Sequence, residues 1–529
     1  MKKWIIILTT IFLLTILTAT FWAYSTFFYT TPITQQELKH LTPDWTKATQ
    51  GNWSPWHTDP TDPTATKAWN PAASFNTWLE TVPEQDKAWP IIVDVRYSNL
   101  DFYLNENIGS YPQELRDWNS LADTIRSQSG QTIIDRTAQA LNRPVMGCGL
   151  YAGTGQIEHD ALLRHGRKDP DWQPNQRADP PISILWQPSL GLHRSSTRWL
   201  QTGAIVALLD GDSDRFISLH ETILNSAHLS NEYPNLISQL VYMAIVAEGA
   251  ESIRWAIQYH PEKLNSVQLS KLDTALAQHA SLKFIWQGEA LLVHDFFRRI
   301  GDTDGHLSMA ELLGKKLGNG LPVEGPATNL PDSQMGSSIT RPLHLYNKIL
   351  QQASTNTSMQ WHNISQSALS VYKNESHTLN SVTRIFIETL APSIDRSVTR
   401  FRMHHQDIAA TRAIIAVHQY KLRTNNFPDS LQDLDSDPKN FTDEFTGKPL
   451  LYIKSNQGPI IYSVGNNLQN DNATKTQQYQ WLTMPQAKDI LISDPDSISG
   501  DYIYFPEPPM TIKDADDDEE WERKTYGDD

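Results

Sequence analysis

The sequence predicts a mainly α-helical protein with an N-terminal transmembrane helix, a helical-bundle or solenoid-like body and a small α+β module near its C-terminus. Three observations predict this fold class. An uncharged apolar run follows two lysines at the N-terminus, apolar residues recur at steps of three and four through the middle of the chain, and two short β-type runs flank a turn near residue 456. The length of 529 residues is enough for about two to four domains.

Residues 1–29 form the predicted membrane anchor. Lys2 and Lys3 precede WIIILTTIFLLTILTATFWAYSTFFY, an uncharged run that ends at Tyr29. This run exceeds the roughly 20 residues that a helix needs to span a hydrocarbon core. Aromatic residues crowd its outer end, as they do at a membrane interface. The segment therefore predicts a transmembrane helix.

The alternative to an anchor is a cleaved signal peptide, which has a shorter apolar core and a small-x-small cleavage site. Here Phe21 stands two positions before Ala23, which fits such a site poorly. We expect an uncleaved single-pass signal anchor in the inner (cytoplasmic) membrane of a bacterium. Lys2 and Lys3 then keep the N-terminus in the cytoplasm and place residues 31–529 in the extracytoplasmic, periplasmic space.

The next two segments are a stalk and a helical body. Residues 30–72 are rich in Pro, Thr and Trp without a sustained period, so they predict an extended stalk. Residues 73–316 form the predicted helical domain, in which NLISQLVYMAIVAEGA is apolar all round and reads as a central helix. WPIIVDVRYSNL, residues 89–100, interrupts the helical pattern and predicts a short strand or an irregular packed stretch.

The amphipathic pattern of this domain is clearest in DRFISLHETILNSAHL. Phe216, Leu219, Ile223 and Ala227 recur there at steps of three and four and form one apolar stripe. A stripe of this kind predicts a helix with one face on the core.

The C-terminal half divides into four predicted segments. Residues 317–345 are rich in Gly, Pro and Ser and predict a linker or a long loop. Residues 346–407 return to a helical pattern, in which Pro392 is expected to end or kink one helix. Residues 408–485 form the predicted helix-plus-β module, and residues 486–529 form an acidic tail.

Charge and cysteine content limit the partners of the chain. The net charge is −16, and the last 17 residues hold nine acidic and three basic ones. An acidic surface excludes a nucleic-acid partner, because phosphate binding needs a basic face. The single cysteine, Cys148, excludes an intrachain disulfide framework and a Cys-based zinc site, and we expect a small buried side chain there.

Two motifs have partial catalytic or cofactor spacing. GCGLYAGTG places Gly147, Gly149 and Ala152 at dinucleotide-binding spacing, but it lacks the hydrophobic strand that should precede them, so it predicts a loop packed against a helix. His220 and His228 are eight residues apart, about 12 Å along a helix, which is too far for one zinc ion. We predict no catalytic and no cofactor-binding residue.

IGDTDGHLSMAEL has two readings. Aligned with a calcium-binding EF-hand loop, Asp302 and Asp304 fall at ligand positions 3 and 5 and Glu311 falls at the bidentate position 12. Ile300 occupies the first position, where a carboxylate is expected, so calcium affinity would be reduced. The other reading is a helix start in which Ser308 is the N-cap and Glu311, three residues on, completes a capping box.

The order of features from residue 408 to 481 carries a family resemblance. A long helix is followed by a Phe-Pro turn, a short second helix, two strands and an Asn-rich loop. The matching residues are Tyr420, Phe427, Pro428, Leu431, Leu434, Asp443, Gly447, Pro449, Tyr452, Tyr462, Ser463 and Gly465. This ordered set resembles the C-terminal region of the major pseudopilins of type II secretion systems (type II secretion system protein G).

The resemblance implies a metal site and a possible lineage. The family's loop binds calcium through Asp carboxylates and carbonyl oxygens. Here the loop reads GNNLQNDN, so Asp471 is the implied carboxylate ligand. The N-terminus departs from the family, since it lacks a short basic leader cut before a Phe and a Glu five residues into the mature helix. The whole layout is also similar to a group of exported bacterial proteins with an anchor, an R-W-L…A…GD segment and this ending, which implies no activity.

These patterns lead to three functional expectations. We expect a membrane-anchored, extracytoplasmic, non-catalytic scaffold or interaction protein of the bacterial cell envelope, with a protein partner and with calcium as the one cofactor to consider. The first alternative is a component or regulator of a type II secretion or pilus-like assembly. The second is an envelope hydrolase whose site forms only in three dimensions.

Overall fold

The computed structural model describes, with short gaps, residues 76–99, 107–168, 188–279, 332–358, 367–473 and 501–506. The predicted anchor and stalk lie outside the described residues. So does the segment of the EF-hand-like motif.

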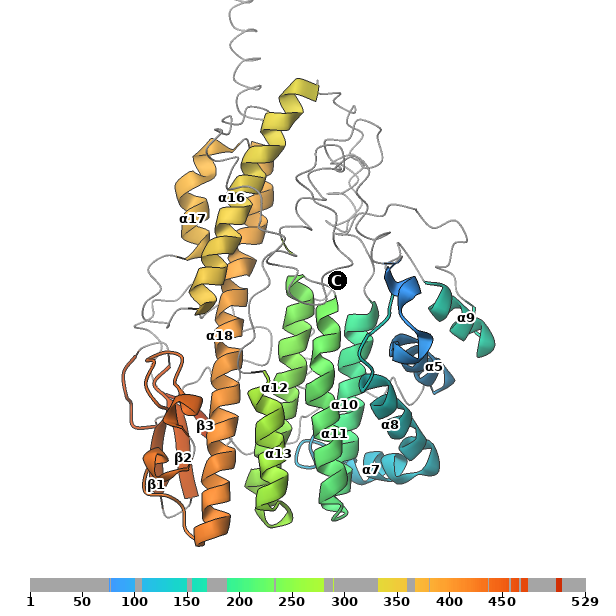
Figure 1. Ribbon diagram of the computed structural model, residues 1–529, viewed down its shortest axis with the longest axis vertical. Coiled ribbons are helices and arrows are strands. Elements are labelled where there is room, and N and C mark those ends of the chain that lie inside the picture. Colours follow the sequence, from blue (N-terminus) through green and yellow to red (C-terminus); the bar gives the residue numbers. More distant parts are fainter. Residues whose placement is uncertain are drawn as a thin grey trace, which may run out of the picture.

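The described chain is mostly helical and carries one small sheet, so the prediction of a mainly α fold is confirmed at that level (Figure 1). The α-helices are α5 (Trp89–Ser98), α7 (Trp118–Arg126), α8 (Gln128–Leu141), α9 (Gln156–Arg164), α10 (Pro188–Leu209), α11 (Ser213–Ser226), α12 (Leu236–Tyr259), α13 (Ser266–Ala277), α16 (Asp332–Ser358), α17 (Ala368–Glu375) and α18 (Ser381–Thr424). Short 3-10 helices are η2 (Glu84–Asp86), η4 (Ala227–Glu232), η5 (Pro261–Lys263), η7 (Ser376–Thr378), η8 (Leu431–Asp433) and η9 (Pro438–Phe441). The strands are β1 (Leu451–Ser455), β2 (Gly458–Ser463) and β3 (Tyr502–Phe505).

Helices α10 to α13 form the centre of the molecule (Figure 1). The predicted stripe of α11 is buried as expected, with Phe216, Leu219 and Ile223 facing the core. Helix α12 is also the central helix that its composition predicted, because apolar side chains are buried all around it. Among the described helices it alone is long and apolar enough to cross a membrane, and most of its length is buried inside the protein.

Residues 89–98 are helical, so the prediction of a strand or irregular stretch at 89–100 was wrong. The run of Ile92, Val93 and Val95 favours a strand by residue type. In α5 these side chains are buried together against α8 and α9. Pro90, in the first turn, has the fixed φ that suits a helix start and needs no amide hydrogen bond there. Burial on one face outweighed the local β preference.

Helices α16 and α18 differ from the predicted segmentation of the C-terminal half. Helix α16 begins at Asp332, inside the predicted linker 317–345. Pro392 does not end a helix, because α18 continues across it from Ser381 to Thr424, and the alternative of a kink at this residue stays a prediction. Proline removes one helical hydrogen bond, but α16 and α17 pack along this part of α18 and hold it. The boundary predicted at residues 407 and 408 therefore falls within one continuous helix of 44 residues.

The C-terminal module contains an antiparallel sheet of order β1-β2-β3. The two predicted strands form the β1–β2 hairpin, in which Leu451 pairs with Tyr462 and Ser455 with Gly458. Strand β3 was missed, since it lies within the predicted acidic tail 486–529. Its Tyr502 and Tyr504 are buried, and they complete the sheet that packs on α18.

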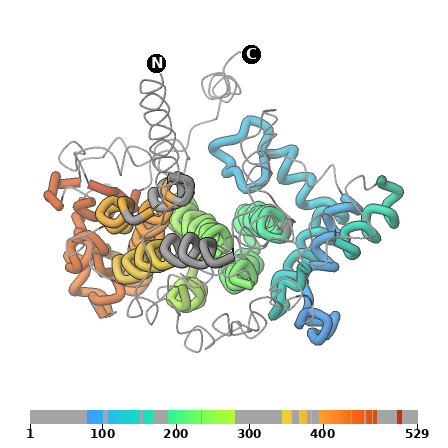
Figure 2. The backbone as a smooth tube through the Cα atoms, turned by 90° about the horizontal axis from the view of Figure 1, so that it is seen from above, coloured from blue at the N-terminus to red at the C-terminus, as the bar shows by residue number. Residues whose placement is uncertain are grey.

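All these elements share one hydrophobic core. A single cluster of buried side chains extends from Ala88 in the first described helices to Tyr504 in the last strand. Viewed from above, the α5–α9 helices and the C-terminal module lie on opposite sides of the α10–α13 group (Figure 2). The helical body and the module are therefore parts of one packed unit, with α18 between them.

Candidate functional site

The residues that carry the pseudopilin resemblance meet at the start of the sheet. Asp443 is almost fully buried, and its Oδ1 accepts hydrogen bonds from the Ser463 hydroxyl and the Phe445 amide, both at 2.9 Å. The Ser463 hydroxyl in turn accepts a bond from the Gly465 amide at 3.1 Å. Gly447 has φ +68°, a left-handed conformation that favours glycine, and its amide donates to the Asp443 carbonyl at 2.7 Å. The cluster joins the 443–448 turn to the end of β2.

Burial and hydrogen bonding act on Asp443 in opposite directions. Burial raises the pKa of its carboxyl, and the bonds from the Phe445 amide and the Ser463 hydroxyl oppose that rise. Asp443 has 1% of its surface exposed, and the groups that donate to its carboxyl belong to the same module. These hydrogen bonds therefore stabilise the local fold. This geometry makes Asp443 a structural organiser of the module.

Two tyrosines of the resemblance attach the sheet to the segments beside it. The Tyr452 hydroxyl donates to the Pro428 carbonyl at 2.9 Å, and the Tyr462 hydroxyl donates to Asn470 Oδ1 at 3.2 Å. The first bond holds the short η8 region against β1, and the second holds the Asn-rich loop against β2. The predicted second helix of this region is shorter than expected and consists of one 3-10 turn, Leu431–Asp433.

Asp471 lies in the predicted calcium loop, but another carboxylate organises that loop. Asp501 is fully buried and accepts the backbone amides of Asp471 at 3.2 Å and Ala473 at 2.7 Å. Burial raises the pKa of Asp501, and the nearby Asp471 charge adds to that rise. Among the described residues no group of three or more His, Cys, Asp and Glu is placed to hold a metal. Asp471 as a calcium ligand stays a prediction.

Sequence reasoning missed Asp501 because of its position rather than its type. It stands directly before β3 in a region that the acidic composition assigned to a tail. The alternating YIYF pattern after it is a strand signal that could have marked the site. The other predicted metal ligands, Asp302, Asp304 and Glu311, lie outside the described residues, so both readings of that segment stay predictions.

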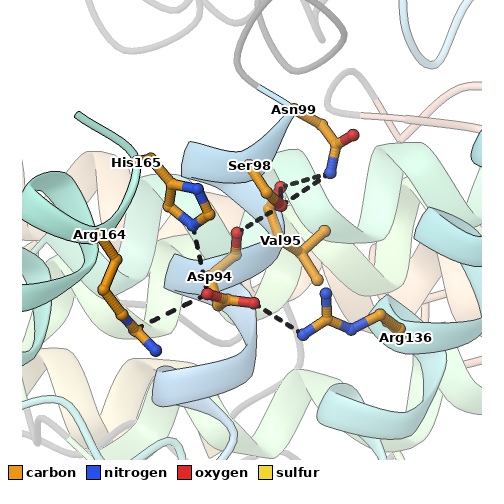
Figure 3. A network of polar contacts seen from close by, with 7 residues as sticks. All are labelled: Asp94, Val95, Ser98, Asn99, Arg136, Arg164 and His165. Atoms are coloured by element: carbon orange, nitrogen blue, oxygen red, sulfur yellow. Dashed lines mark hydrogen bonds and ion pairs between the residues drawn. The ribbon is translucent and has the colours of Figure 1, made fainter. Parts of the chain in front are cut away.

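A polar network joins three helices on the surface of the N-terminal part (Figure 3). Asp94 on α5 accepts a hydrogen bond from Arg136 of α8 at 2.9 Å. It also contacts His165 Nε2 at 3.3 Å and Arg164 at 3.7 Å, at the C-terminal end of α9. Burial alone would raise the pKa of Asp94, but the bonds from Arg136 and His165 bring it below its usual range. The network clamps α5, α8 and α9 together and is open to solvent.

The described start of the glycine-rich segment, residues 147–149, contacts carboxyl groups of the protein itself. Glu232 accepts the amides of Met146 and Gly147, the latter at 3.1 Å with φ +77°. A bound phosphate would need these same amides. Cys148 is fully buried, as predicted, and its thiol faces Glu158 at 3.9 Å. Residues 147–149 are thus packed without helix or strand structure, and the rest of the motif up to residue 154, which includes Ala152, lies outside the described residues.

A serine–histidine arrangement is the feature closest to hydrolase chemistry. His193 contacts Ser230 through Nδ1 at 3.0 Å and Ser226 through Nε2 at 3.2 Å. Ser226 donates its proton to a backbone carbonyl, so His193 Nε2 donates to Ser226 and Nδ1 accepts from Ser230. Ser230 has 1% of its surface exposed, so no substrate reaches its hydroxyl in this conformation. The pair therefore fills the core with its hydrogen bonds satisfied.

Comparison with known proteins adds no assignment. No protein-family model, no curated protein and no solved structure matches this chain.

Proposed function

We propose that this protein is a non-catalytic scaffold of the bacterial cell envelope, anchored in the cytoplasmic membrane by residues 1–29. The observation that carries the proposal is the geometry of α18. This helix of 44 residues is about 66 Å long at 1.5 Å per residue. It packs against α16 and α17 along its N-terminal part, and its C-terminal half lies between the α12–α13 pair and the module (Figure 1). One continuous helix of this length gives the module and the helical body a common rigid support.

The contacts between α18 and the module favour a fixed attachment. The Gln406 side chain accepts a hydrogen bond from the Glu444 amide at 2.6 Å. Arg402, two per cent exposed, is close enough to Glu444 for the two charges to interact, and burial lowers the pKa of its guanidinium. A buried polar contact of this kind specifies one orientation of two packed surfaces. A fixed module suits a docking role better than a flexible tether does.

A second candidate is a component or regulator of a type II secretion or pilus-like assembly. The specific observation in its favour is that Asp443, Ser463 and Gly465, which match the family, form one hydrogen-bonded cluster. The cluster supports a fold in common between this module and the pseudopilin C-terminal region. A role in a secretion assembly requires in addition that the module binds the same class of partner protein.

In-cell photo-crosslinking tests both candidates. A photo-reactive amino acid is placed in the full-length protein at Leu468 of the module, 44% exposed, and in a matched variant at Leu163 of α9, 55% exposed. We expect Leu468 to capture one defined envelope protein, and we expect the Asp443→Ala substitution to abolish that capture while leaving products from Leu163 unchanged. Mass spectrometry identifies the product.

The identity of the captured protein separates the two candidates. Pilin-like subunits or a secretion platform protein at Leu468 would assign the chain to the assembly class. Another envelope protein would support the scaffold. Leu468 products that persist in full after Asp443→Ala, or that never exceed those of an unirradiated sample, would contradict both proposals.

A further inference from the structure

The seam between α18 and the α12–α13 pair contains three buried imidazoles. His404 and His418 lie on α18, fourteen residues or about 21 Å apart along the helix. His279 is the second residue after the end of α13. Each has about 6% of its surface exposed or less. Histidine is the side chain whose charge changes most readily between pH 5 and 8, so this seam places three such groups where two parts of the protein meet.

Tyr242, His279 and His404 form a connected polar cluster in one part of the seam. The Tyr242 hydroxyl of α12 hydrogen-bonds His279 Nδ1, and His404 hydrogen-bonds the backbone of His279. The Tyr242 ring lies 5.5 Å from that of His279 and 5.9 Å from that of His404, measured between centroids. The Nε2 atoms of His279 and His404 have no hydrogen-bond partner among the described residues. A proton taken up there would create an imidazolium in a dry interior.

The groups that face the three imidazoles offer no compensating charge. Among the described residues, the chargeable neighbours of His279 are Tyr242 of α12 and His228 of η4, and those of His404 are His405 of α18 and His279 itself. At the lower end, His418 faces Lys421 of α18 and hydrogen-bonds the backbone of Pro261 in η5. None of these neighbours is a carboxylate and most are bases, so protonation of the seam brings positive charges together.

Two ion pairs cross the same seam, and the pair formed by Arg254 and Asp407 weakens in the same direction. Arg254 of α12 donates to Asp407 Oδ1 at 2.8 Å, and Arg412 of α18 binds Asp273 of α13 at 2.8 Å. Burial raises the pKa of Asp407, although the charge of Arg254 opposes that rise. Acid therefore removes the negative partner of Arg254 while it adds positive charge at the histidines.

We propose that the seam between α18 and the α12–α13 pair is an acid-sensitive latch, which opens when its three buried histidines take up protons and swings α18 and the C-terminal module away from the body. The two-state element is α18, whose apolar face is held against α12 and α13 at neutral pH. Opening would expose that face and the polar seam to solvent. The latch is a property of the folded chain and does not depend on the partner inferred above.

The direction of the pH response follows from linkage. Burial lowers the pKa of His279 and of His418 to about 4, and it lowers that of His404 well below its usual value. In the open state these groups return to the ordinary histidine pKa of about 6.5. The open state thus binds more protons between pH 6.5 and 4, so falling pH favours opening in that window.

Distance measurement on the purified full-length protein tests the latch. Val267 of α13 and Leu422 of α18 are 69% and 42% exposed, so replacing both with cysteines for spin labels disturbs little. Cys148 is fully buried and does not compete for label. We expect the distance between the two labels to lengthen by about 10 Å, the width of one helix, as pH falls from 7.5 to 4.5. Circular dichroism should show that the helices persist.

Matched variants give the decisive comparison. In the triple variant His279→Gln, His404→Gln and His418→Gln, the opening should move down by about one pH unit or more. His377→Gln, at an exposed position, should open at the parent pH. If the triple variant does not fold, His418→Gln alone, remote from the Tyr242 bond, should still move the midpoint. The latch is refuted if the triple variant opens at the parent pH, if the distance stays constant while helicity is kept, or if helicity is lost together with the distance change.

Discussion

At the scale of single residues, Glu232 illustrates how burial decides the behaviour of a carboxyl group. Both of its oxygens accept backbone amides, yet burial raises its pKa to about 8. The unfolded chain ionises this group near pH 4.5 while the folded protein keeps it protonated, so its contribution to stability falls as pH rises from 4.5 to 8. We expect Glu232→Gln, which cannot ionise, to gain stability relative to wild type by up to about 1.4 kcal/mol for each pH unit across that window.

Urea unfolding at pH 5 and at pH 8 measures this difference. The matched variant Glu232→Ala removes both acceptors and should be destabilised at both pH values, because two buried amides lose their partner. A difference between the glutamine variant and wild type that is the same at pH 5 and pH 8 would contradict a raised pKa at Glu232.

A second residue-scale prediction concerns the turn at the start of the sheet. Asp443→Ala leaves the Phe445 amide and the Ser463 hydroxyl as buried donors without their acceptor, and it should lower the free energy of unfolding by about 2–4 kcal/mol. Asp443→Asn keeps the shape and one acceptor, so its loss should be clearly smaller. Chemical denaturation ranks the two variants, and equal losses would show that the acceptor role is unimportant.

At the scale of elements, the contact between α12 and α18 is fixed by a buried ion pair. Arg254 is 4% exposed and bonds both Asp407 and Thr411. Arg254→Met or Asp407→Leu alone strands one buried charge, so each should cost about 3–5 kcal/mol of stability. The double variant strands neither charge and should lose less than the sum of the two. Thermal or urea unfolding of the four proteins gives this coupling.

The surface pair Arg126–Asp210 is the matched control for that cycle. Its two charges are 2.7 Å apart but both side chains are more than 40% exposed. A solvent-screened pair contributes about 0–1 kcal/mol, so its coupling should be well below that of Arg254 and Asp407. Equal coupling in the two cycles would mean that burial of the α12–α18 pair has no energetic weight.

Element types were predictable where one interaction dominates. The stripe of α11 and the all-apolar α12 follow from periodicity, and the β1–β2 hairpin follows from its turn residues. The errors at α5 and β3, and the continuation of α18 across Pro392, have one physical cause. In each, packing against elements distant in sequence outweighed a local preference, and that packing is invisible to a reading of neighbouring residues.

Site residues were likewise predictable when they belong to a local sequence pattern, and were missed when their partners are distant in sequence. Asp443, Ser463 and Gly465 were found because they belong to an ordered local pattern. Asp501, Glu232 and Asp94 were missed, since their partners lie about 30 to 86 residues away and no spacing rule connects them. The contact between His279, which follows α13, and His404 of α18 is equally hard to predict before the packing of these two helices is known.

At the scale of the whole molecule, one hydrophobic core extends from the first helices to the last strand. We therefore expect the protein to unfold in a single cooperative transition near neutral pH, with equal calorimetric and van't Hoff enthalpies. A chain cut after Thr424 should lose cooperativity and aggregate, because buried residues such as Phe441 and Phe445 no longer cover α18. Calorimetry checks both statements, and two separated transitions would show that the module is an independent domain.

The length of chain between α12 and α18 has a consequence for synthesis. Arg254 leaves the ribosome 153 residues before its partner Asp407. At about 5–20 residues per second, the nascent chain then exposes one apolar face of α12 for roughly eight to thirty seconds. Over that interval the growing chain carries an open surface that favours aggregation, so a holding chaperone should bind it until α18 has been made. Ribosome-bound chains that end before residue 381 are the form in which such a chaperone would be captured.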